Sequence, residues 1–427
     1  MSSLTYIDKV GAKALLLKED KNIISRKKFL ERSFFDRFRQ KKIYQCAEQC
    51  FFNEYLWTET ESETKAVEKM LTSIQEGQVS DVSELSKLIP IIACYRPLYK
   101  TDITEKILEI ENAVNNPDFT HLVKYAIREP QQELELQNNI TEFGKLTNSI
   151  SKKVKKQYEE NSYPRWRYDV NQTKYKKDVS AAPLQILVAG CGTGSSAVYA
   201  ALEQSNSEIY AVDLSKTRLA YAKRQAEELE IENMHFYCGD LLNIESLEKK
   251  FDYILVTGVL HHMEKPLVGL EKLLTVLKPG GVMHIGLYSE LARKAVNAAK
   301  EYFAEHDIIY SPENLRSFRE HVKVLDSDDE LLRLALMSDF YSLSECRNML
   351  FHEIEHQFSI SDIKEIVSDF GLEFTGFVAK DRRLEEYYKR YPDPEDQLNL
   401  DLWDNFERKN PLTFIGMYEF TVHKPVE

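Results

Sequence analysis

The chain has 427 residues, of which 43% are hydrophobic and 29% charged, and its formal net charge is −13. This length predicts two or three domains, and the composition excludes disorder as the main state. The 69 acidic residues outnumber the 56 basic ones, which argues against non-specific binding to nucleic acid, a process that Lys and Arg drive.

Cysteine usage and hydropathy predict a cytoplasmic protein. The six cysteines are scattered without paired spacing, as is typical of a reducing compartment. The N-terminal residues form only a short apolar patch before charges resume, so we expect no signal peptide. No apolar run approaches the ~18 residues that a membrane-spanning helix needs.

Residues 1–150 are predicted to form a helical domain without strands of its own. Thr58 with Glu61 predicts a capping box at one helix start. Asp81 with Glu84 is expected to begin the next helix, which ends at Pro90 because proline interrupts the helical hydrogen bonds. A further helix is expected over 133–150.

Residues 151–183 are predicted to be a linker that lies over the following domain as an arm. The stretch is rich in Lys and Tyr, and Pro164 breaks any helix around it. Its lysine cluster at 152–156 is interpreted as a solvated helix face, because the neighbouring acids Glu159 and Glu160 weaken a role in nucleic-acid binding.

From residue 184 the hydrophobic pattern alternates between strands and helices. Strands are expected over 184–189, 208–212, 234–237, 251–256, 282–287, 372–377 and 414–422. The alternation predicts an α/β fold over 184–427, with a doubly wound, seven-stranded, Rossmann-like sheet. Residues 289–358, after the fifth strand, are predicted to be a helical insertion placed as a lid over the ligand-binding edge.

A glycine-rich segment after the first of these strands is the most informative motif. Residues 188–194 read Val-Ala-Gly-Cys-Gly-Thr-Gly, and such glycines let a ligand approach the backbone. Asp213 ends the next strand, where a carboxylate can hydrogen-bond ribose hydroxyls, and Asp240 follows the third strand, where a carboxylate can accept the adenine amino group. Because Ser195 stands where the dinucleotide fingerprint needs its third glycine, S-adenosylmethionine is the favoured ligand.

At this point the chain resembles the class I S-adenosylmethionine-dependent methyltransferases. The likeness rests on 186–194 with Val212-Asp213-Leu214, and on loops at 259–263 and 277–281 that are similar to loops of that superfamily. The resemblance implies a methyltransferase with S-adenosylmethionine as cofactor.

Further segments resemble a narrower group, namely bacterial methyltransferases often fused to tetratricopeptide repeats and similar to lysine methyltransferases of outer-membrane proteins. These segments are 49–55, 128–130, 157–166, 286–290 and 339–356. The resemblance implies a bacterial enzyme of protein methylation that forms a homodimer, with the helical N-terminal domain as a dimerisation module. The chain departs from the group at Ser162, where the group has Pro, and it lacks the repeats.

The candidate cofactor-binding residues come from the arm and from the strand ends. Arg165 is a candidate for pairing with the methionine carboxylate, and Tyr163 or Trp166 for facing the sulfonium. The alternative for all three is a packed linker with an aromatic anchor. The full set is Tyr163, Arg165, Trp166, Gly190, Cys191, Gly192, Gly194, Asp213, Leu214, Ser215, Asp240, Leu241, Gly258 and Val259.

The candidate catalytic residues follow the fourth and fifth strands or lie in the insertion. His261 or His262 is a substrate wall or a base, although a loop that only supports the cofactor is the favoured interpretation. In the insertion, Glu345, His352 and His356 would share one face of a helix. A buried polar network in the lid is the alternative for any one of them. The full set is His261, His262, Tyr288, Tyr341, Arg347, His352 and His356.

His352-Glu353-Ile354-Glu355-His356 also matches the H-E-x-x-H pattern of zinc protease helices. No further Gly and His follow in the manner of the larger zinc motif, and the surrounding sequence is that of a methyltransferase. We therefore interpret the match as accidental and expect no metal.

The sequence thus predicts a methyltransferase whose acceptor is a protein, with a lysine side-chain amine favoured. The negative net charge supports this prediction mildly, because it attracts basic peptides. A small molecule or peptide natural product is the alternative acceptor. A non-catalytic cofactor-binding module is a further alternative, which the intact glycine loop with its two aspartates disfavours.

Overall fold

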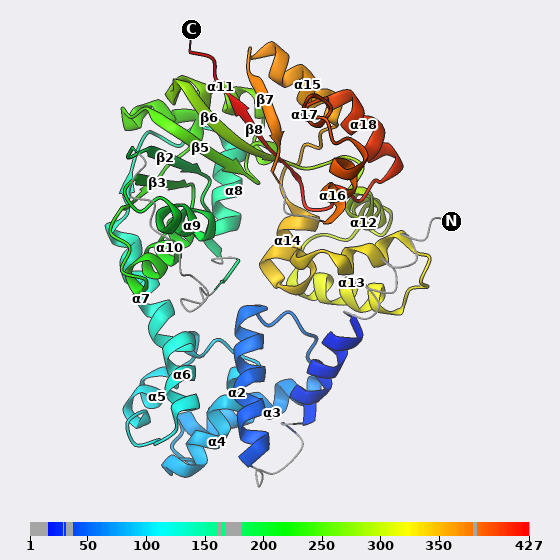
Figure 1. Ribbon diagram of the computed structural model, residues 1–427. Coiled ribbons are helices and arrows are strands. Elements are labelled where there is room, and N and C mark those ends of the chain that lie inside the picture. The colour runs from blue at the N-terminus through cyan, green and yellow to red at the C-terminus, as the bar shows by residue number, and fades with distance from the viewer. Residues whose placement is uncertain are drawn as a thin grey trace. The chain divides into compact units, whose positions relative to one another are not determined.

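The computed structural model describes residues 16–28, 30, 37–160, 164–166, 182–378 and 382–426. The chain divides into two compact units, one formed by 1–135 with 298–351 and the other by 136–297 with 352–427. Figure 1 shows a helical unit and a unit built on a sheet. No helix among the described residues is long and apolar enough to cross a membrane.

The helical unit begins with elements from the N-terminal third of the chain. They are α2 (Arg37–Phe52), α3 (Glu61–Gln75), α4 (Val82–Ala93), η1 (Leu98–Lys100), α5 (Thr104–Ile110), α6 (Pro117–Val123), the π-helical turn η2 (Lys124–Arg128) and most of α7 (Glu129–Leu136). One apolar core holds them together, with Phe119, Leu122 and Ile89 fully buried. The thiols of Cys46, Cys50 and Cys94 meet inside this core.

Three local predictions for this region are wrong. The capping box is formed by Thr60 with Glu63, two residues after the predicted pair, and both of its hydrogen bonds are present. Helix α4 continues three residues past Pro90, to Ala93, because the apolar side chains around the proline are all buried.

The predicted helix over 133–150 is interrupted. Gly144 adopts a left-handed conformation with φ of 63°, and β1 (Thr141–Glu142) forms before it. The N-terminal 150 residues therefore do contain a strand.

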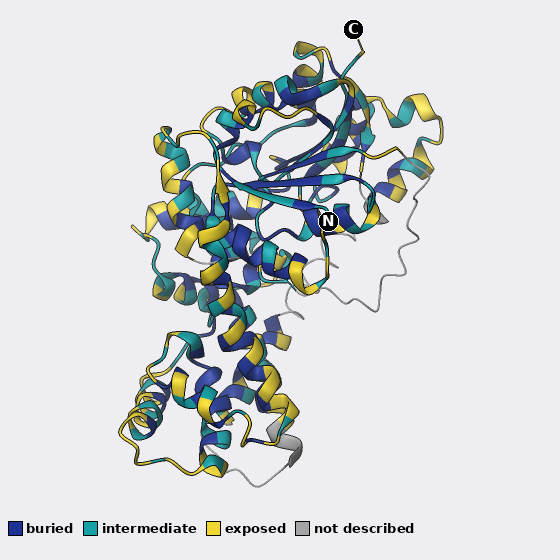
Figure 2. Cartoon of the chain, turned by 90° about the vertical axis from the view of Figure 1, so that its left-hand side faces the viewer, coloured by how far each residue is buried: buried dark blue, intermediate teal, exposed yellow. Residues whose placement is uncertain are grey.

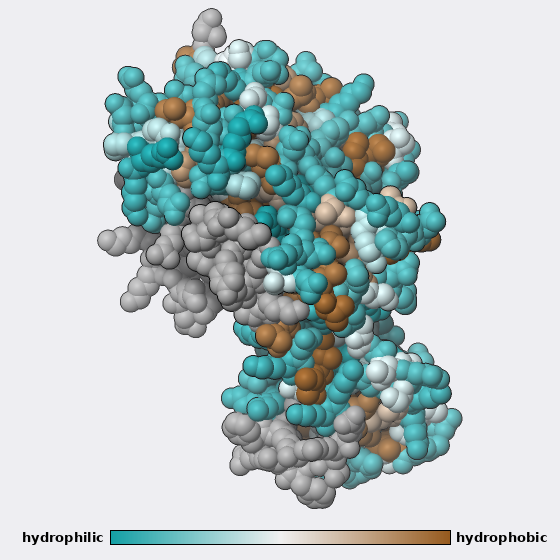
Figure 3. Space-filling view, turned by 90° about the vertical axis from the view of Figure 1, so that its right-hand side faces the viewer, coloured by the Kyte–Doolittle hydropathy of each residue, from teal (hydrophilic) through white to brown (hydrophobic). Residues whose placement is uncertain are grey.

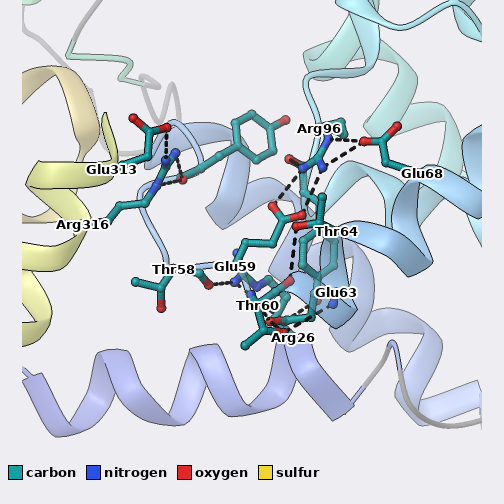
Figure 4. A network of polar contacts seen from close by, with 12 residues as sticks. Arg26, Thr58, Glu59, Thr60, Glu63, Thr64, Glu68, Arg96, Glu313 and Arg316 are labelled. Atoms are coloured by element: carbon teal, nitrogen blue, oxygen red, sulfur yellow. Dashed lines mark hydrogen bonds and ion pairs between the residues drawn. The ribbon is translucent and has the colours of Figure 1, made fainter. Parts of the chain in front are cut away.

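Polar networks reinforce the helical unit (Figure 4). Arg96 donates to both oxygens of Glu59, at 2.9 and 3.0 Å, and also to Glu68 at 3.1 Å. The Tyr95 hydroxyl donates to Glu63 at 3.0 Å, next to the buried Arg26. Such paired charges satisfy one another where water is excluded.

The predicted lid lies mostly in the helical unit, which corrects the predicted division of the chain. Residues 298–351 comprise most of α12 (Lys294–Glu305) and all of α13 (Pro312–Val324), η7 (Glu330–Leu336), η8 (Ser338–Tyr341) and α14 (Leu343–Phe351). A buried ion pair joins Arg319 to Glu19 at 2.7 Å. The Leu343 N–H also donates to the Asn53 carbonyl. These contacts join residues about 300 positions apart, which the pattern of the sequence does not reveal. The sequence alone therefore places the insertion in the sheet domain that surrounds it in the chain.

The sheet unit contains an eight-stranded, mostly parallel sheet with the order β1-β4-β3-β2-β5-β6-β8-β7. Its strands are β1 with β2 (Gln185–Ala189), β3 (Glu208–Asp213), β4 (Met234–Cys238), β5 (Phe251–Thr257), β6 (Leu277–Leu287), β7 (Glu373–Phe377) and β8 (Tyr418–His423). Only β8 runs antiparallel to its neighbours. The seven predicted strands are present, and β1 is an eighth that pairs with β4.

Helices cover both faces of the sheet, as a doubly wound fold requires. On one face α9 (Ser195–Glu203) and α10 (Lys216–Glu228) enclose one core. On the other face α11 (Pro266–Val276), α15 (Ile360–Asp369) and α18 (Leu400–Lys409) enclose a second. Figure 2 shows the strands as the most continuously buried part of this unit.

The remaining elements of this unit are short or lie outside these two layers. They are η3 (Gln137–Asn139), α8 (Ser149–Glu160), η5 (Leu241–Leu247), η6 (Leu260–His262), α16 (Arg382–Arg390) and α17 (Pro394–Gln397). Hydrophilic side chains predominate on the face in Figure 3, and apolar ones occupy small areas. This agrees with the mean hydropathy of −0.43.

Candidate active site

The glycine loop connects β2 to α9 at the carboxyl edge of the sheet. Gly190, Gly192 and Gly194 all have positive φ, at 70°, 55° and 86°. A Cβ on Gly190 would lie 2.2 Å from Val259, and one on Gly194 would lie 2.4 Å from Ala222. No atom lies within 4 Å of a Cβ on Gly192. Two glycines are therefore needed for packing, and the middle one leaves the backbone open to a ligand.

Asp213, at the end of β3, holds the glycine loop in place. Its carboxylate accepts the Gly192 N–H and the Ser215 N–H, each at 2.9 Å, and its side chain is buried. A carboxylate has about four acceptor positions, so two remain for ligand hydroxyls. Ser215 in turn caps α10 by accepting the Arg218 N–H.

Asp240 follows β4 and is also buried. One of its oxygens accepts the Leu242 N–H at 3.0 Å, which caps η5. Asp240 therefore caps η5 and also lies at the carboxyl edge of the sheet, as Asp213 does.

These residues surround a hollow of about 630 Å³, counted to its open mouth. The lining residues are Ile150, Ser151, Val154, Tyr158, Gly190, Asp213, Leu214, Arg218, Gly239, Asp240, Leu241, Gly258, Val259, His262 and Met263. We call Gly190, Asp213 and Asp240 the floor of this hollow.

The hollow fits a nucleoside ligand. It combines apolar side chains with the two buried carboxylates Asp213 and Asp240, which are acceptors for hydroxyl and amino groups. Of the fourteen predicted cofactor-binding residues, the structure brings Gly190, Asp213, Leu214, Asp240, Leu241, Gly258 and Val259 to its lining.

Helix α8 covers the hollow, which sequence reasoning did not anticipate. Ile150, Val154 and Tyr158 recur at every fourth position and line it. Such spacing places them on one side of a helix, and the exposed Lys152, Lys153 and Lys156 lie between them. The amphipathic stripe in 149–160 was the signal that could have identified this wall.

The predicted arm residues take another place. The Trp166 indole donates to the Thr193 carbonyl at 2.9 Å, and the Thr193 hydroxyl donates to the Pro164 carbonyl at 2.7 Å. The Arg165 guanidinium lies 5.5 Å from the ring centre of Tyr221 on α10. Neither Arg165 nor Trp166 lines the hollow, and Trp166 contacts the glycine loop through Thr193, so their assignment as cofactor-binding residues stays a prediction. Tyr163 lies outside the described residues.

His261 and His262 lie in η6, directly after β5, and both are buried. The His261 ring stacks on Tyr288 with centroids 3.8 Å apart. Burial lowers the pKa of His261 to about 3, and burial also lowers the pKa of His262 well below its usual value. Both rings are therefore neutral near pH 7 and are poorly suited to hold a proton as general bases.

His352 does not share a helix with its predicted partners, because α14 ends at Phe351. His352 stacks on His262, with centroids 3.7 Å apart, and its Nε2 lies 2.9 Å from the Tyr158 hydroxyl. The predicted common face of Glu345, His352 and His356 is therefore wrong. Tyr158 and His262 line the hollow and His352 contacts both, so we call these three residues together the wall.

The segment 352–356 folds back against the loop after β5. The His356 N–H donates to the His261 carbonyl at 2.8 Å. Glu355 forms a buried ion pair with Arg293, whose guanidinium also lies 4.0 Å from the Tyr288 ring centre. Among the described residues, no group of three or more His, Cys, Asp or Glu side chains could hold a metal ion. The H-E-x-x-H match therefore does not lie on a helix, as the zinc-binding pattern requires.

Two predicted catalytic residues belong to the helical unit. The Tyr341 hydroxyl donates to the Ala335 carbonyl at 2.9 Å. The Arg347 guanidinium lies 4.1 Å from the Tyr310 ring centre. Nearby, burial raises the pKa of Glu345 to about 7. These contacts are all internal to that unit, and the catalytic assignments of Tyr341 and Arg347 stay predictions.

Comparison with known proteins agrees with this geometry. Residues 182–335 match a family model described as a methyltransferase domain. An uncharacterised protein of Synechococcus is 31% identical over 211 residues, which cover 46% of this chain and 49% of that protein. A probable (S)-tetrahydroprotoberberine N-methyltransferase of Papaver bracteatum is 28% identical over 153 residues, covering 33% and 42% of the two chains.

Among solved structures, PKMT2 from Rickettsia typhi aligns with a TM-score of 0.42 and 20% identity, over 57% of this chain and 50% of that one. The chain spans about half the length of the first two curated relatives that it matches. Residues 182–335 thus carry a methyltransferase domain, which confirms the predicted kind of enzyme and its cofactor, S-adenosylmethionine.

Proposed function

We propose that this protein transfers the methyl group of S-adenosylmethionine to a protein, with a lysine side-chain amine as the favoured acceptor. The observation that carries the proposal is the hollow at the carboxyl edge of the sheet, with two buried carboxylates on its floor and an aromatic wall. Open α/β sheets bind their ligands at this edge.

The floor residues would hold the nucleoside. Asp213 has acceptor positions left for the two ribose hydroxyls, and Asp240 has one carboxylate oxygen beyond its helix-cap bond for the adenine amino group. Bound there, the cofactor supplies a methyl group on a sulfonium, which an amine lone pair attacks as the C–S bond breaks and its electron pair stays on sulfur. The task of the protein is then to align the acceptor nitrogen and to exclude water.

The choice of a protein acceptor rests on charge and on resemblance. The net charge of −13 favours encounter with basic peptides. The resemblance of segments such as 157–166 to lysine methyltransferases points the same way. The homodimer that this resemblance implies is part of the proposal, and light scattering of the purified chain tests it.

A small-molecule acceptor is the second candidate. The observation that favours it is the similarity of part of the chain to the probable (S)-tetrahydroprotoberberine N-methyltransferase of Papaver bracteatum and to a ubiquinone biosynthesis O-methyltransferase of Dinoroseobacter shibae, which is 28% identical over 182 residues. Both acceptor classes would use the same floor.

Labelling separates the two candidates. We expect tritium-labelled S-adenosylmethionine, incubated with the protein and a bacterial lysate, to label protein bands on a gel. Acid hydrolysis of those bands should release methyl-lysine. Label transferred only to a small molecule other than S-adenosylmethionine would favour the second candidate. No transfer of label to a protein or to such a small molecule, together with no cofactor binding by calorimetry, would contradict the proposed function itself.

A further inference from the structure

A lysine acceptor must be deprotonated before methyl transfer, and the floor offers no group to receive the proton. With a pKa of about 10.4, fewer than about one lysine in a thousand carries a free lone pair at pH 7. The ammonium must lose a proton before the nitrogen can attack. The residue that receives this proton must line the hollow or contact a residue that does, and it must be able to hold the proton.

The two fully buried histidines do not meet this requirement. His261 has its pKa lowered to about 3, and the pKa of His262 is also lowered strongly, in both cases mainly by burial. Asp213 and Asp240 are occupied by backbone N–H groups and are assigned to the nucleoside. His352 differs from these, because it is only partly buried and its ring contacts Tyr158, which lines the hollow.

The contacts of the His352 ring fix which nitrogen carries its proton. Nδ1 lies 2.7 Å from the carbonyl oxygen of Ile354. The Ile354 N–H donates to this nitrogen at 3.3 Å when Nδ1 is bare, but the much closer approach of 2.7 Å to the carbonyl favours the tautomer in which Nδ1 carries the proton. In the neutral ring Nε2 is therefore the acceptor, and the Tyr158 hydroxyl, 2.9 Å away, donates to it.

The neighbouring His262 ring reinforces this arrangement. Its Nδ1 lies 2.9 Å from the same Ile354 carbonyl, so that one oxygen with two lone pairs serves both rings. The two rings stack with centroids 3.7 Å apart. The stack and the shared acceptor prevent the His352 ring from turning over.

The Tyr158 ring packs against Arg218. The Arg218 guanidinium carbon lies 3.3 Å from the centre of the Tyr158 ring and covers one face of it. Tyr158 lines the hollow and its hydroxyl contacts His352. A phenolic oxygen that donates its proton in one hydrogen bond can also accept another.

From this geometry we infer that Tyr158 and His352 form a proton relay that deprotonates the acceptor ammonium during methyl transfer. An N–H of the ammonium donates to the Tyr158 oxygen and gives up its proton there, while the Tyr158 proton passes to Nε2 of His352. The resulting imidazolium keeps its Nδ1–H bond to Ile354 and releases one proton to solvent from its partly exposed ring. Tyr158 is then a catalytic residue and His352 acts through it. This inference rests on the proposed lysine acceptor.

The charged and titratable groups around His352 come from several elements. They are Tyr158 on α8, His262 and His261 on η6, and the ion pair between Lys153 and Glu353, which is 3.1 Å long and exposed. Lys153 and Glu353 neutralise one another near the surface, and the two other histidines stay neutral. A proton on His352 is thus the main change of charge that the relay introduces.

The kinetic test uses Tyr158→Phe, which keeps the ring over Arg218 and removes only the hydroxyl. With poly-L-lysine and tritium-labelled S-adenosylmethionine, we expect kcat at pH 7 to fall about 100-fold, because general acid–base catalysis contributes 10²–10⁴-fold. The variant needs an amine that is already deprotonated, so its rate should rise about tenfold per pH unit and approach the wild-type rate near pH 10. A deficit that stays constant from pH 7 to 10 would overturn the relay.

Two controls accompany this measurement. Tyr199→Phe removes a hydroxyl from the exposed face of α9 and should leave kcat unchanged. Calorimetry should give Tyr158→Phe a cofactor affinity within about threefold of wild type, since the floor is intact. Reduced cofactor affinity at full kcat would make Tyr158 a part of the binding site only, and would contradict the inference.

A spectroscopic readout tests the relay without any substrate. In protein with ¹⁵N-labelled histidine, His352 should show the tautomer protonated at Nδ1, and the Nε2 signal should shift in Tyr158→Phe. His352→Gln identifies the signal. A His352 protonated at Nε2 would overturn the relay even if methyl transfer is observed. Failure of wild type to bind S-adenosylmethionine or to methylate poly-L-lysine would instead count against the proposed function, and the tautomer would still decide the relay.

Discussion

The floor and the wall of the hollow are built in different ways. The floor consists of short motifs at the ends of neighbouring strands, and its key hydrogen bonds join residues 2 to 21 positions apart. The wall joins α8, η6 and the segment after α14, with 194 positions between Tyr158 and His352 and 92 between His262 and Ile354. Strand order thus creates the floor, whereas the wall depends on how distant segments pack. The two parts should therefore respond differently to substitution.

The largest expected effect lies behind the wall, in the buried ion pair of Arg293 with Glu355. Both side chains are at least 96% buried, so Glu355→Ala leaves an uncompensated charge and should lower the free energy of unfolding by about 3–5 kcal/mol. Urea unfolding followed by circular dichroism measures this. The control Asp404→Ala breaks the ion pair with the exposed Arg408 and should cost less than about 1 kcal/mol. Equal costs would show that the segment 352–356 is not anchored as described.

The next largest effect is expected on cofactor affinity, when Asp213 of the floor is replaced. Asp213→Ala removes the acceptor of two loop N–H groups and of the ligand hydroxyls. Two hydrogen bonds to a charged acceptor, each contributing about 1.5–3 kcal/mol, predict at least about 100-fold weaker binding of S-adenosylmethionine by calorimetry. Glu271→Ala, on the exposed side of α11, should not change the affinity. Unchanged affinity in Asp213→Ala would contradict the assignment of the floor.

A smaller effect on stability distinguishes a glycine with a close packing contact from a glycine that is needed only for its positive φ. Gly194→Ala combines a φ of 86° with a Cβ 2.4 Å from Ala222, and should lower the free energy of unfolding by about 1–3 kcal/mol. Gly371 has a φ of 60° but open space around it, so Gly371→Ala should cost only about 1 kcal/mol. Thermal unfolding of the two variants, side by side, decides whether the close contact adds to the strain.

The smallest effect is a pH dependence that arises next to the wall. His261 has a folded-state pKa of about 3, below its ordinary value of 6.5, so the unfolded chain binds the extra proton between these values. Stability should therefore be constant above pH 6.5 and fall as the pH drops below it, by at most about 1.4 kcal/mol per pH unit for this residue. His261→Phe keeps the stack on Tyr288 and should reduce this slope. An unchanged slope between pH 7.5 and 5 would assign the acid sensitivity to other groups.

Several failures of the sequence predictions share one cause. His352 was expected on a helix with Glu345, but the helix stops at Phe351 and the chain pairs Phe358 with Ser289 instead. The lid was expected above the sheet, but Arg319 and Glu19 tie most of it to the N-terminal helices. Periodicity in a sequence reports which face of a segment is apolar and does not report its partner.

What the sequence determined by itself is the floor and the class of chemistry. The glycine loop and both aspartates are local signals whose positions follow from the order of parallel strands, and they predicted S-adenosylmethionine. Only the tertiary structure decided that α8 closes the hollow, that Arg165 and Trp166 lie outside it, and that Tyr158 meets His352. These contacts depend on side-chain packing between distant segments, which no spacing within the chain encodes.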